Sequence, residues 1–247
     1  MAREHREWLG REDIRPVPVP SGPLRGAARC ILSEDDQTGA MTALVEAAGG
    51  WSGAPGALAG LVELFVVRGE LELGGAALGR LGYAELADGA EVTASAPSAV
   101  LLMVDPARAD DAPSETLVVE GEGLPWEKEL HGAPAGVGVK VIRSGTDGEP
   151  VTLLVGNVPR YDSGPEFHEC PEEIFVLEGD VGNETVSVRA GDYLWRPAYI
   201  THGPYRSETG LLVFLRGHGE LTAYWIDNPN ATVEQNRAYA ARLRAGR

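Results

Sequence analysis

The sequence predicts an all-β fold of two tandem barrels followed by a short C-terminal helix. Apolar runs of strand length recur along the chain and are separated by its 32 glycines and 17 prolines, a distribution typical of sandwiches and barrels. The chain also matches itself without gaps at a period of 110 residues, which indicates a duplicated unit. The one clear helix signal lies near the C-terminus. Together these observations favour one barrel per repeat.

The expected elements follow from local patterns. Strands are expected at residues 41–45, 63–67, 99–104, 116–119, 139–142, 151–155, 174–177, 211–215 and 221–225, where β-branched and apolar residues dominate short segments. The helix is expected after Thr232, because Thr232 and Gln235 have the spacing of a capping box. Good helix formers then continue through residues 236–245.

The repeat sets the expected domain organisation. Residues 42–45 align with 152–155, and residues 63–69 align with 173–179. Two barrels of about 110 residues each agree with usual domain sizes. We expect an extended, proline-bearing arm at 1–25, an N-terminal barrel at 26–106, a C-terminal barrel at 116–229 and the terminal helix at 230–247.

Composition excludes several classes of partner. The formal net charge is −16, with 37 acidic against 21 basic residues, and nucleic-acid binding depends on clustered Lys and Arg. No apolar run reaches the length of a membrane span, and the first residues lack the apolar segment of a secretory signal. Only Cys30 and Cys170 are present, so no disulfide framework is indicated. We expect a cytoplasmic protein with no nucleic-acid or membrane partner.

Four residues in the second repeat form a candidate metal site. Glu166 and His168 are two positions apart, so on an extended strand their side chains leave from the same face. Glu172 opens the next expected strand, and His202 follows a turn at the end of a later hairpin. Two carboxylates and two imidazoles form a mixed oxygen and nitrogen donor set for a divalent cation.

The spacing of these residues resembles the first motif of the cupin family, small double-stranded β-helix (jelly-roll) barrels. That motif runs His-x-His, three or four residues, Glu, six residues and Gly. Glu172 stands at the matching distances from His168 and from Gly179. Glu166 occupies the place of the family's first histidine. The same stretch is also similar to the cupin-like domain of zinc-binding anti-sigma regulators.

The family's second motif runs Gly, five residues, Pro, a few residues and His, and Gly191, Pro197 and His202 match it. The resemblance covers the fold and the binding region. It implies two tandem jelly-roll barrels, a bicupin, with one divalent metal ion per chain. Fe(II) or Mn(II) is favoured, and Zn(II) or Ni(II) is the alternative.

The expected metal ligands are Glu166, His168, Glu172 and His202. Glu173 is the alternative to Glu172, because strand parity lets only one of two neighbours face inward. Motif spacing favours Glu172. In addition, the repeat retains a glutamate, residue 63, opposite Glu173 in a copy without the other ligands, which favours a structural role for Glu173.

The N-terminal copy is expected to be metal-free. Gly56, Leu58, Val62 and Thr93 occupy the positions that correspond to the four ligands of the second copy. None of them offers more than a weak hydroxyl donor.

A small-molecule pocket is expected beside the second motif. Aromatic walls suit a partly apolar organic ligand, and an arginine can hold a carboxylate by a bidentate contact. The expected pocket residues are Tyr193, Trp195, Arg196 and Tyr199, with Tyr205 and Arg160 as further candidates.

The resemblance implies a metal-dependent enzyme that acts on a small organic molecule, most simply a non-haem dioxygenase. Glu172 and His202 would then be catalytic, with Glu172 able to shuttle a proton. The alternatives are a redox-neutral isomerase, lyase or decarboxylase, and a non-catalytic sensor of metal or ligand. We also expect a homodimer, because exposed sheet edges and an extended arm tend to be covered by a partner.

Overall fold

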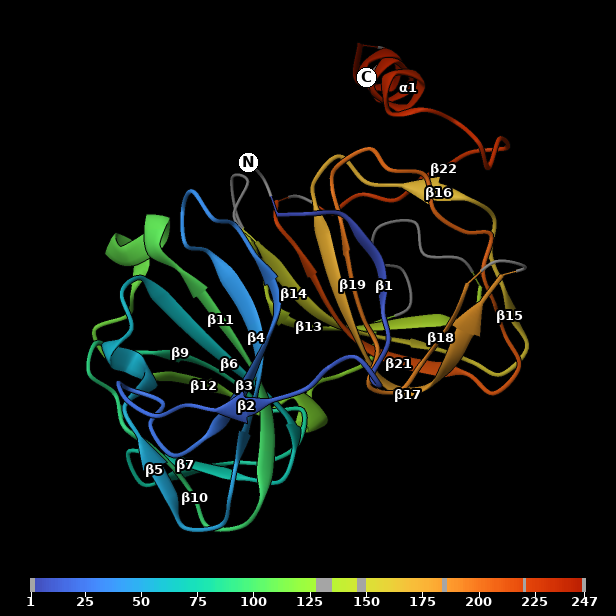
Figure 1. Cartoon of the computed structure of the whole chain (residues 1–247). Helices are drawn as coiled ribbons and strands as arrows, with labels where there is room; N and C mark the ends of the chain where they lie inside the picture. The colour runs from blue at the N-terminus through green and yellow to red at the C-terminus, as the bar shows by residue number, and fades with distance from the viewer. Residues whose placement is uncertain (1–2, 128–134, 146–149, 184–185, 220, 246–247) are drawn as a thin grey trace. The chain divides into compact units, whose positions relative to one another are not determined.

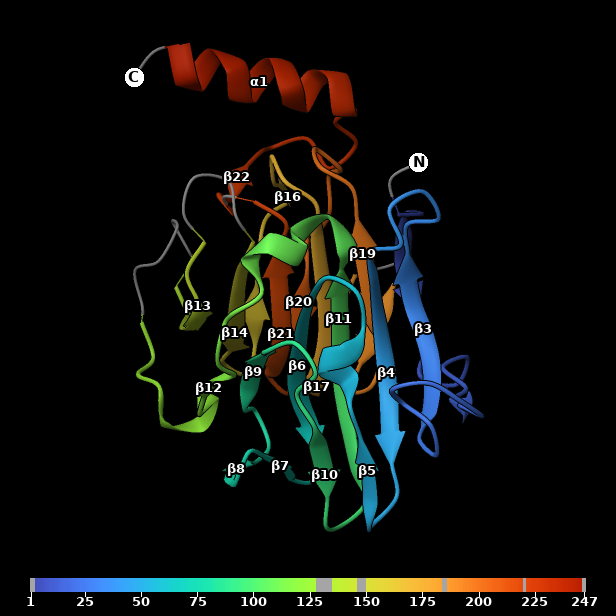
Figure 2. The ribbon, with the colours of Figure 1, turned by 90° about the vertical axis from the view of Figure 1, so that its left-hand side faces the viewer.

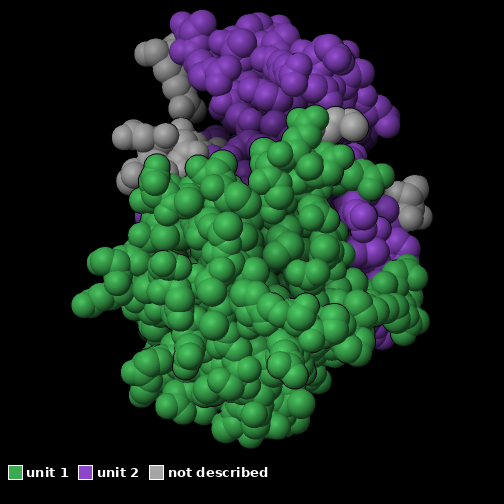
Figure 3. Space-filling view, turned by 60° about the vertical axis from the view of Figure 1, so that its left-hand side comes forward, with its two compact units in different colours: residues 1–4, 12–124 green, residues 5–11, 125–247 purple. Residues whose placement is uncertain are grey.

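The computed structural model describes residues 3–127, 135–145, 150–183, 186–219 and 221–245. Across these ranges strands dominate, and one α-helix, α1 (Val233–Ala245), follows the last strand. The predicted all-β fold with a terminal helix is confirmed. The chain divides into two compact units, Met1–Glu4 with Glu12–Leu124 and His5–Arg11 with Pro125–Arg247 (Figure 3).

The first unit contains two sheets (Figure 1). A seven-stranded sheet has the order β12-β9-β6-β11-β4-β3-β2, and a four-stranded sheet has the order β5-β10-β7-β8. The strand bounds are β2 Val17–Pro18, β3 Ala28–Glu34, β4 Met41–Ala47, β5 Trp51–Gly53, β6 Leu61–Arg68, β7 Leu71–Leu73, β8 Ala76–Leu78, β9 Tyr83–Leu86, β10 Val92–Ala94, β11 Ser98–Asp105 and β12 Leu117–Val119.

The core of the first unit lies between these two sheets. Every second residue of β6 and of β11 is buried in one aliphatic cluster, because side chains on alternate strand positions share a face. Strands β4, β7 and β10 contribute to the same cluster. Its members include Val45, Val62, Leu64, Val66, Leu71, Leu73, Val92, Val100, Leu102 and Val104. Figure 2 shows β3 and β4 as neighbouring antiparallel strands of the larger sheet.

The second unit contains one large sheet and a two-stranded pair. The sheet has the order β1-β19-β17-β21-β14-β13, with β15, β18 and β20 attached through β17, and β16 pairs with β22. The bounds are β1 Arg6–Leu9, β13 Val137–Arg143, β14 Val151–Asn157, β15 Tyr161–Asp162, β16 Glu166–Phe167, β17 Glu172–Gly182, β18 Ser187–Arg189, β19 Tyr193–Arg196, β20 Arg206–Ser207, β21 Leu211–Gly217 and β22 Tyr224–Trp225.

The two units share a strand order. The path β9-β6-β11-β4-β3 in the first unit corresponds to β19-β17-β21-β14-β13 in the second. The register corresponds as well, because Phe65 pairs with Tyr83 and Phe175 pairs with Tyr193. The sequence period of 110 residues therefore coincides with a repeated arrangement of five strands.

Two segments belong to a different unit from the one that the sequence predicts for them. Residues 116–119 are expected to open the second barrel, but β12 pairs with β9 and the first unit extends to Leu124. The physical reason is that β9 would otherwise end the sheet with unpaired backbone groups. Residues 1–25 are expected to form one arm, but Arg6–Leu9 forms strand β1 on β19 of the second unit. The sequence of β1 carries no alternating signal that predicts this strand.

Helix α1 begins at the predicted capping box. The Thr232 N–H donates to Gln235 Oε1 at 2.9 Å, and the Gln235 N–H donates to Thr232 Oγ1 at 3.3 Å. Asn236 connects the helix to the loop before His202. Its side-chain amide donates to the Tyr199 carbonyl at 2.9 Å and to Thr201 Oγ1 at 2.8 Å. Among the described residues, no helix is long and apolar enough to cross a membrane.

Candidate metal centre

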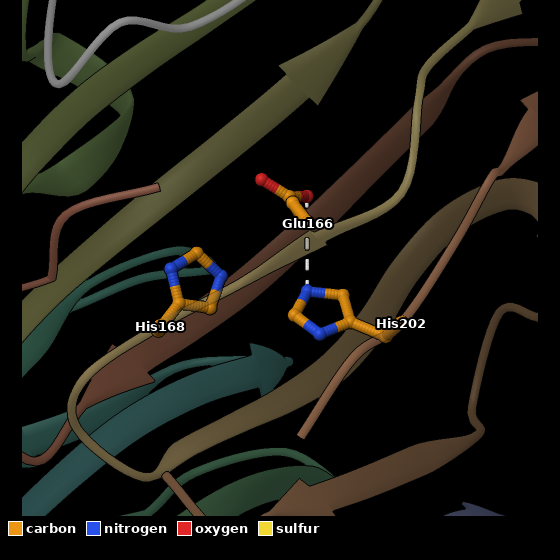
Figure 4. Close-up of side chains that lie close together, drawn as sticks. All are labelled: Glu166, His168 and His202. Atoms are coloured by element: carbon orange, nitrogen blue, oxygen red, sulfur yellow. Dashed lines mark ion pairs between the residues drawn. The ribbon is translucent and has the colours of Figure 1, made fainter. Parts of the chain in front are cut away.

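Glu166, His168 and His202 come together from two segments of the second unit. Glu166 begins β16, which pairs with β22, and His168 follows this strand directly. The backbone N–H of Glu166 donates to the carbonyl of His202, and the N–H of His202 donates to the carbonyl of Glu166, both at 2.9 Å. This bridge holds the loop of His202 against β16. Figure 4 shows the three side chains facing one another.

One ligand atom from each of these three residues lies within 4.8 Å of the others, a geometry that could hold a metal ion. Glu166 Oε1 is 3.7 Å from His202 Nε2. Glu172, the first residue of β17, lies beside the same group. Its Oε1 is 3.4 Å from His202 Nε2, and its Oε2 is 3.5 Å from His168 Nε2. The side chains of His168, Glu172 and His202 are 9, 3 and 4% exposed.

The second nitrogen of each imidazole determines which tautomer is present. His168 Nδ1 lies 3.1 Å from the Thr222 carbonyl, and His202 Nδ1 lies 3.1 Å from the Ile200 carbonyl. A carbonyl oxygen only accepts hydrogen bonds, so each Nδ1 carries the proton. In the neutral rings, each Nε2 then points an unshared electron pair toward the carboxylates. This is the arrangement in which histidine binds metals.

Burial and neighbouring charges shift the ionisation of the site. Burial lowers the pKa of His202 to about 3, against the opposing effect of Glu172. Burial would raise the pKa of Glu172, but His202, His168 and Arg196 together lower it to about 2. Burial raises the pKa of Glu166 to about 7. At neutral pH the His202 imidazole is therefore neutral and Glu172 is an anion, so their electron pairs face one another, an arrangement that a cation stabilises.

Arg196, the last residue of β19, lies behind Glu172. Its Nη1 donates to Glu172 Oε1 at 2.9 Å, and its Nη2 donates to the hydroxyl of Tyr205 at 2.6 Å. Glu7 of strand β1 accepts two further hydrogen bonds from Arg196. Its Oε2 accepts from Nε at 3.0 Å, and its Oε1 accepts from Nη2 at 2.9 Å. Arg196 is therefore held by protein carboxylates. No sequence signal marked Glu7 as part of the site, because it lies in a polar segment far from both motifs.

A cavity of about 180 Å³ extends from the candidate metal centre into the barrel. Its walls are mostly aliphatic, and the candidate metal ligands Glu166, His168, Glu172 and His202 are among its polar lining residues. The aliphatic lining includes Val139, Leu153, Val155, Ile174, Val176, Val188, Leu194, Val213, Leu215 and Leu221, and the polar lining includes Asn157, Tyr161, Ser163 and Tyr205. Such a combination of an apolar body and a few convergent polar groups is typical of small-molecule sites.

Of the four expected pocket residues, Arg196 lines this cavity, and Tyr193, Trp195 and Tyr199 are not among its lining residues. The side chain of Trp195 packs edge-on against His218, and Tyr199 lies near Phe167. The physical reason is strand parity: Tyr193 and Trp195 alternate with Leu194 and Arg196, which face the cavity. Tyr205 lines the cavity, as does Trp225, which lies outside both sequence motifs. Arg160 is exposed.

Glu172 and Glu173 point to opposite faces of β17. Glu173 accepts a hydrogen bond from the Tyr193 hydroxyl at 2.7 Å and lies 3.2 Å from His218 Nε2. The structure thus places Glu172 beside the candidate ligands and Glu173 in a separate polar contact. In the first unit the hydroxyl of Tyr83 likewise donates to Glu63. This correspondence accounts for a glutamate at this position in both copies.

The first unit has no comparable donor set at the positions that match the four ligands. A side chain at residue 56 would collide with backbone, because a Cβ on Gly56 would lie 2.4 Å from the Ala90 nitrogen. Val62 is buried in the aliphatic core.

Near the second site, burial raises the pKa of the Cys170 thiol to about 12, so Cys170 does not offer a thiolate. His131 lies outside the described residues.

Comparison with known families agrees with this architecture. Residues 114–222 match the family model of the ChrR cupin-like domain. No curated protein matches the sequence.

Several solved structures are similar over most of the chain. A protein from Nostoc punctiforme, provisionally named a dioxygenase, superposes with a TM-score of 0.72 at 17% identity, over 92% of this chain and 88% of its own. Oxalate decarboxylase from Lactobacillus farciminis, in complex with formate, gives 0.62 at 9% identity over 94% and 96%. A protein from Pseudomonas aeruginosa, provisionally named glyoxylate-induced, gives 0.60 at 18% over 91% and 90%. At these identities the likeness concerns the fold, which is that of cupin β-barrel proteins.

Proposed function

We propose that this cupin-fold chain is a metal-dependent enzyme that acts on a small organic molecule, with dioxygenase chemistry as the first assignment. The observation that supports this proposal most directly is the convergence of two imidazole Nε2 atoms and two carboxylates in the lining of a largely aliphatic cavity. The imidazole tautomers are set by backbone carbonyls, so the nitrogen electron pairs face the site before any ion binds.

The proposed ligands are Glu166, His168, Glu172 and His202, which suit a divalent ion with Fe(II) or Mn(II) favoured. Four protein donors leave one or two positions of an octahedral ion for substrate. When bound, such an ion supplies an open coordination position and redox chemistry, whereas zinc supplies Lewis acidity alone.

The two carboxylates differ in protonation before a metal ion binds. Glu172 is held by Arg196 and has a pKa of about 2, so it stays an anion and serves as a ligand. Burial raises the pKa of Glu166 to about 7, which is near the value at which a carboxyl group exchanges protons at neutral pH. A divalent ion that binds here would displace the proton of Glu166, so both carboxylates would then serve as anionic ligands.

The cavity limits the substrate class. Its aliphatic walls favour a compact apolar body and exclude water from the reacting group. A cavity of this size, about 180 Å³, is comparable to the roughly 150 Å³ engineered cavity that binds benzene. Arg196 already pairs with two carboxylates, so a substrate carboxylate or enol is expected to bind at the ion rather than at this arginine.

The test begins with the metal content of protein purified without oxygen, followed by oxygen uptake with β-diketones, catechols and hydroxy acids. We expect about one divalent ion per chain, and turnover that requires Fe(II) or Mn(II) and is lost in His202→Ala. Protein reconstituted with zinc is the matched comparison, since zinc supports Lewis-acid but not redox chemistry. Full activity with zinc would replace the dioxygenase assignment by an isomerase, lyase or decarboxylase.

A sensor is the second candidate, because residues 114–222 match the ChrR cupin-like domain. In that case metal or ligand occupancy would be detected without turnover. Tight binding of a small molecule, with no product formed under Fe(II), Mn(II) or Zn(II), would favour this candidate over the enzyme. The absence of metal from the purified and reconstituted protein would contradict both.

A further inference from the structure

We propose that Glu7, on the N-terminal strand β1, is a positioning and charge-balancing residue of the metal centre, acting on Glu172 through Arg196. The inference rests on the metal site of the proposed function and adds a residue that neither motif contains. Glu7 is 189 positions from Arg196 in sequence, and strand pairing brings the two together.

Strand β1 is anchored independently of Glu7. It pairs with β19, with Arg6 opposite Trp195 and Leu9 opposite Tyr193. The Trp8 indole N–H donates to Asp192 Oδ2 at 3.0 Å, and the backbone N–H of Arg11 donates to Asp192 Oδ1 at 2.8 Å. The position of Glu7 is therefore determined by its strand, and its carboxylate meets an arginine that β19 holds in place.

Glu7 controls which edge of the guanidinium faces Glu172. Its two oxygens occupy Nε and Nη2 of Arg196, which leaves Nη1 for Glu172 Oε1. Glu172 Oε2 then remains directed at His168 Nε2, 3.5 Å away. Arginine pairs with carboxylates most strongly through two parallel hydrogen bonds. Without Glu7, the guanidinium would be able to take both oxygens of Glu172 and withdraw this ligand from the ion.

Charge balance points to the same residue. With their carboxylates ionised, Glu7, Glu166 and Glu172 carry three negative charges, and Arg196 carries one positive charge. Their sum is −2, which one divalent cation neutralises. Loss of the Glu7 charge would leave a sum of −1, and a bound divalent ion would give the buried group an excess positive charge. Uncompensated buried charge is costly, so cation affinity should fall.

The test is a double-mutant cycle on the full-length chain, with Mn²⁺ and Zn²⁺ binding measured by isothermal titration calorimetry. Glu7→Gln keeps the size of the side chain and removes its charge, and we expect about tenfold weaker binding or more, within the range of coupling seen for groups in one network. Glu7→Asp keeps the charge and should recover most of the affinity. The double variant Glu7→Gln with Arg196→Met restores the sum of −2 and should bind more tightly than Glu7→Gln alone.

Trp8→Phe is the matched control, because it removes a hydrogen bond that anchors β1 without changing any charge at the site. Wild-type affinity in Glu7→Gln, or an equal loss in Trp8→Phe, would overturn the proposal in favour of a purely structural strand. If Glu7→Gln does not fold, the double variant Glu7→Gln with Arg196→Met still tests the proposal. Metal binding by this variant that is more than about tenfold weaker than in wild type would contradict charge compensation. A wild-type chain that binds neither ion would instead contradict the proposed function itself.

Discussion

Arg196 Nη1 donates a 2.9 Å hydrogen bond to Glu172 Oε1, and both side chains are only 3% exposed. A buried charge pair of this kind is costly to break from one side, because the remaining charge loses its partner without regaining water. The pair therefore links the stability of the second unit to the geometry of its candidate metal centre.

Replacement of this arginine is expected to destabilise the chain. Arg196→Met should lower the free energy of unfolding by about 3–5 kcal/mol, as for other broken buried pairs. The measurement is urea unfolding of metal-free protein with an unchanged m-value. The matched control is Arg206→Met, because Arg206 and Asp162 form an exposed pair at 3.1 Å and such pairs contribute at most about 1 kcal/mol. Equal effects of the two substitutions would contradict the proposed importance of burial.

Metal binding is expected to depend on the two histidines. His168→Ala and His202→Ala should each abolish tight binding of a divalent ion while the far-UV circular dichroism stays unchanged, because the core consists of aliphatic strands. Calorimetric titration with Mn²⁺ measures the loss.

Glu172→Gln and Glu173→Gln form a matched pair on opposite faces of one strand. We expect the first to weaken binding of a divalent ion by about tenfold or more, the range reported for residues that support metal sites. The second should leave binding nearly unchanged, since Glu173 contacts Tyr193 and His218 instead. The reverse order would mean that Glu173 is the ligand.

Metal affinity is expected to rise with pH up to about 7. Burial raises the pKa of Glu166 from 4.5 to about 7, so below pH 7 an entering cation must displace its proton. The proton also stabilises the metal-free fold: this contribution is fully present below pH 4.5 and is lost as pH rises through 7. Titrations between pH 5 and 8 should show proton release on binding that Glu166→Gln removes. Affinity that is independent of pH in wild type would contradict this assignment.

The contribution of Glu172 to folding stability changes with pH in the opposite direction. Glu172 has a folded pKa of about 2, below its ordinary value of 4.5, so its contribution to stability is present above pH 4.5 and is lost as pH falls toward 2. Thermal melts of metal-free protein should therefore show a loss of stability across this interval. The loss should be smaller in Glu172→Gln, which has no carboxylate to protonate. If that variant loses as much thermal stability at low pH as wild type, acid unfolding is caused by other groups.

Helix α1 is expected to hold the loop that carries His202. Asn236→Ala removes two hydrogen bonds to residues 199 and 201, each of which contributes about 0.5–1.5 kcal/mol to stability. Hydrogen exchange of the backbone amides at 199–202 should become faster. Arg242→Ala, an exposed change on the same helix, is the control. Equal protection in both variants would show that the helix does not support this loop.

Residue spacing predicted much of the candidate site. Glu166 and His168 share a strand face because side chains alternate with a period of two. Glu172 follows His168 by four residues. Such local rules require no knowledge of the rest of the molecule. The capping box at Thr232 and Gln235 was predictable for the same reason, since both hydrogen bonds that define it are local.

Other features depended on long-range pairing. Alternation along β19 separates Tyr193 and Trp195 from Leu194 and Arg196, but it does not state which pair faces the cavity. Only the folded sheet, in which β19 lies between β1 and β17, settles this question. The pairing of β12 with β9 in the first unit likewise could not be read from the sequence, because β9 is distant in the chain.

The sequence by itself determined the all-β class, the repeat, the terminal helix and four candidate ligands, because strand periodicity, caps and motif spacing act over a few residues. Tertiary structure alone decided that Arg196 is bound by Glu7 and Glu172 rather than left for a substrate. It also decided that Tyr205 and Trp225 line the cavity. These outcomes depend on which strands become neighbours, and hence on contacts between residues far apart along the chain.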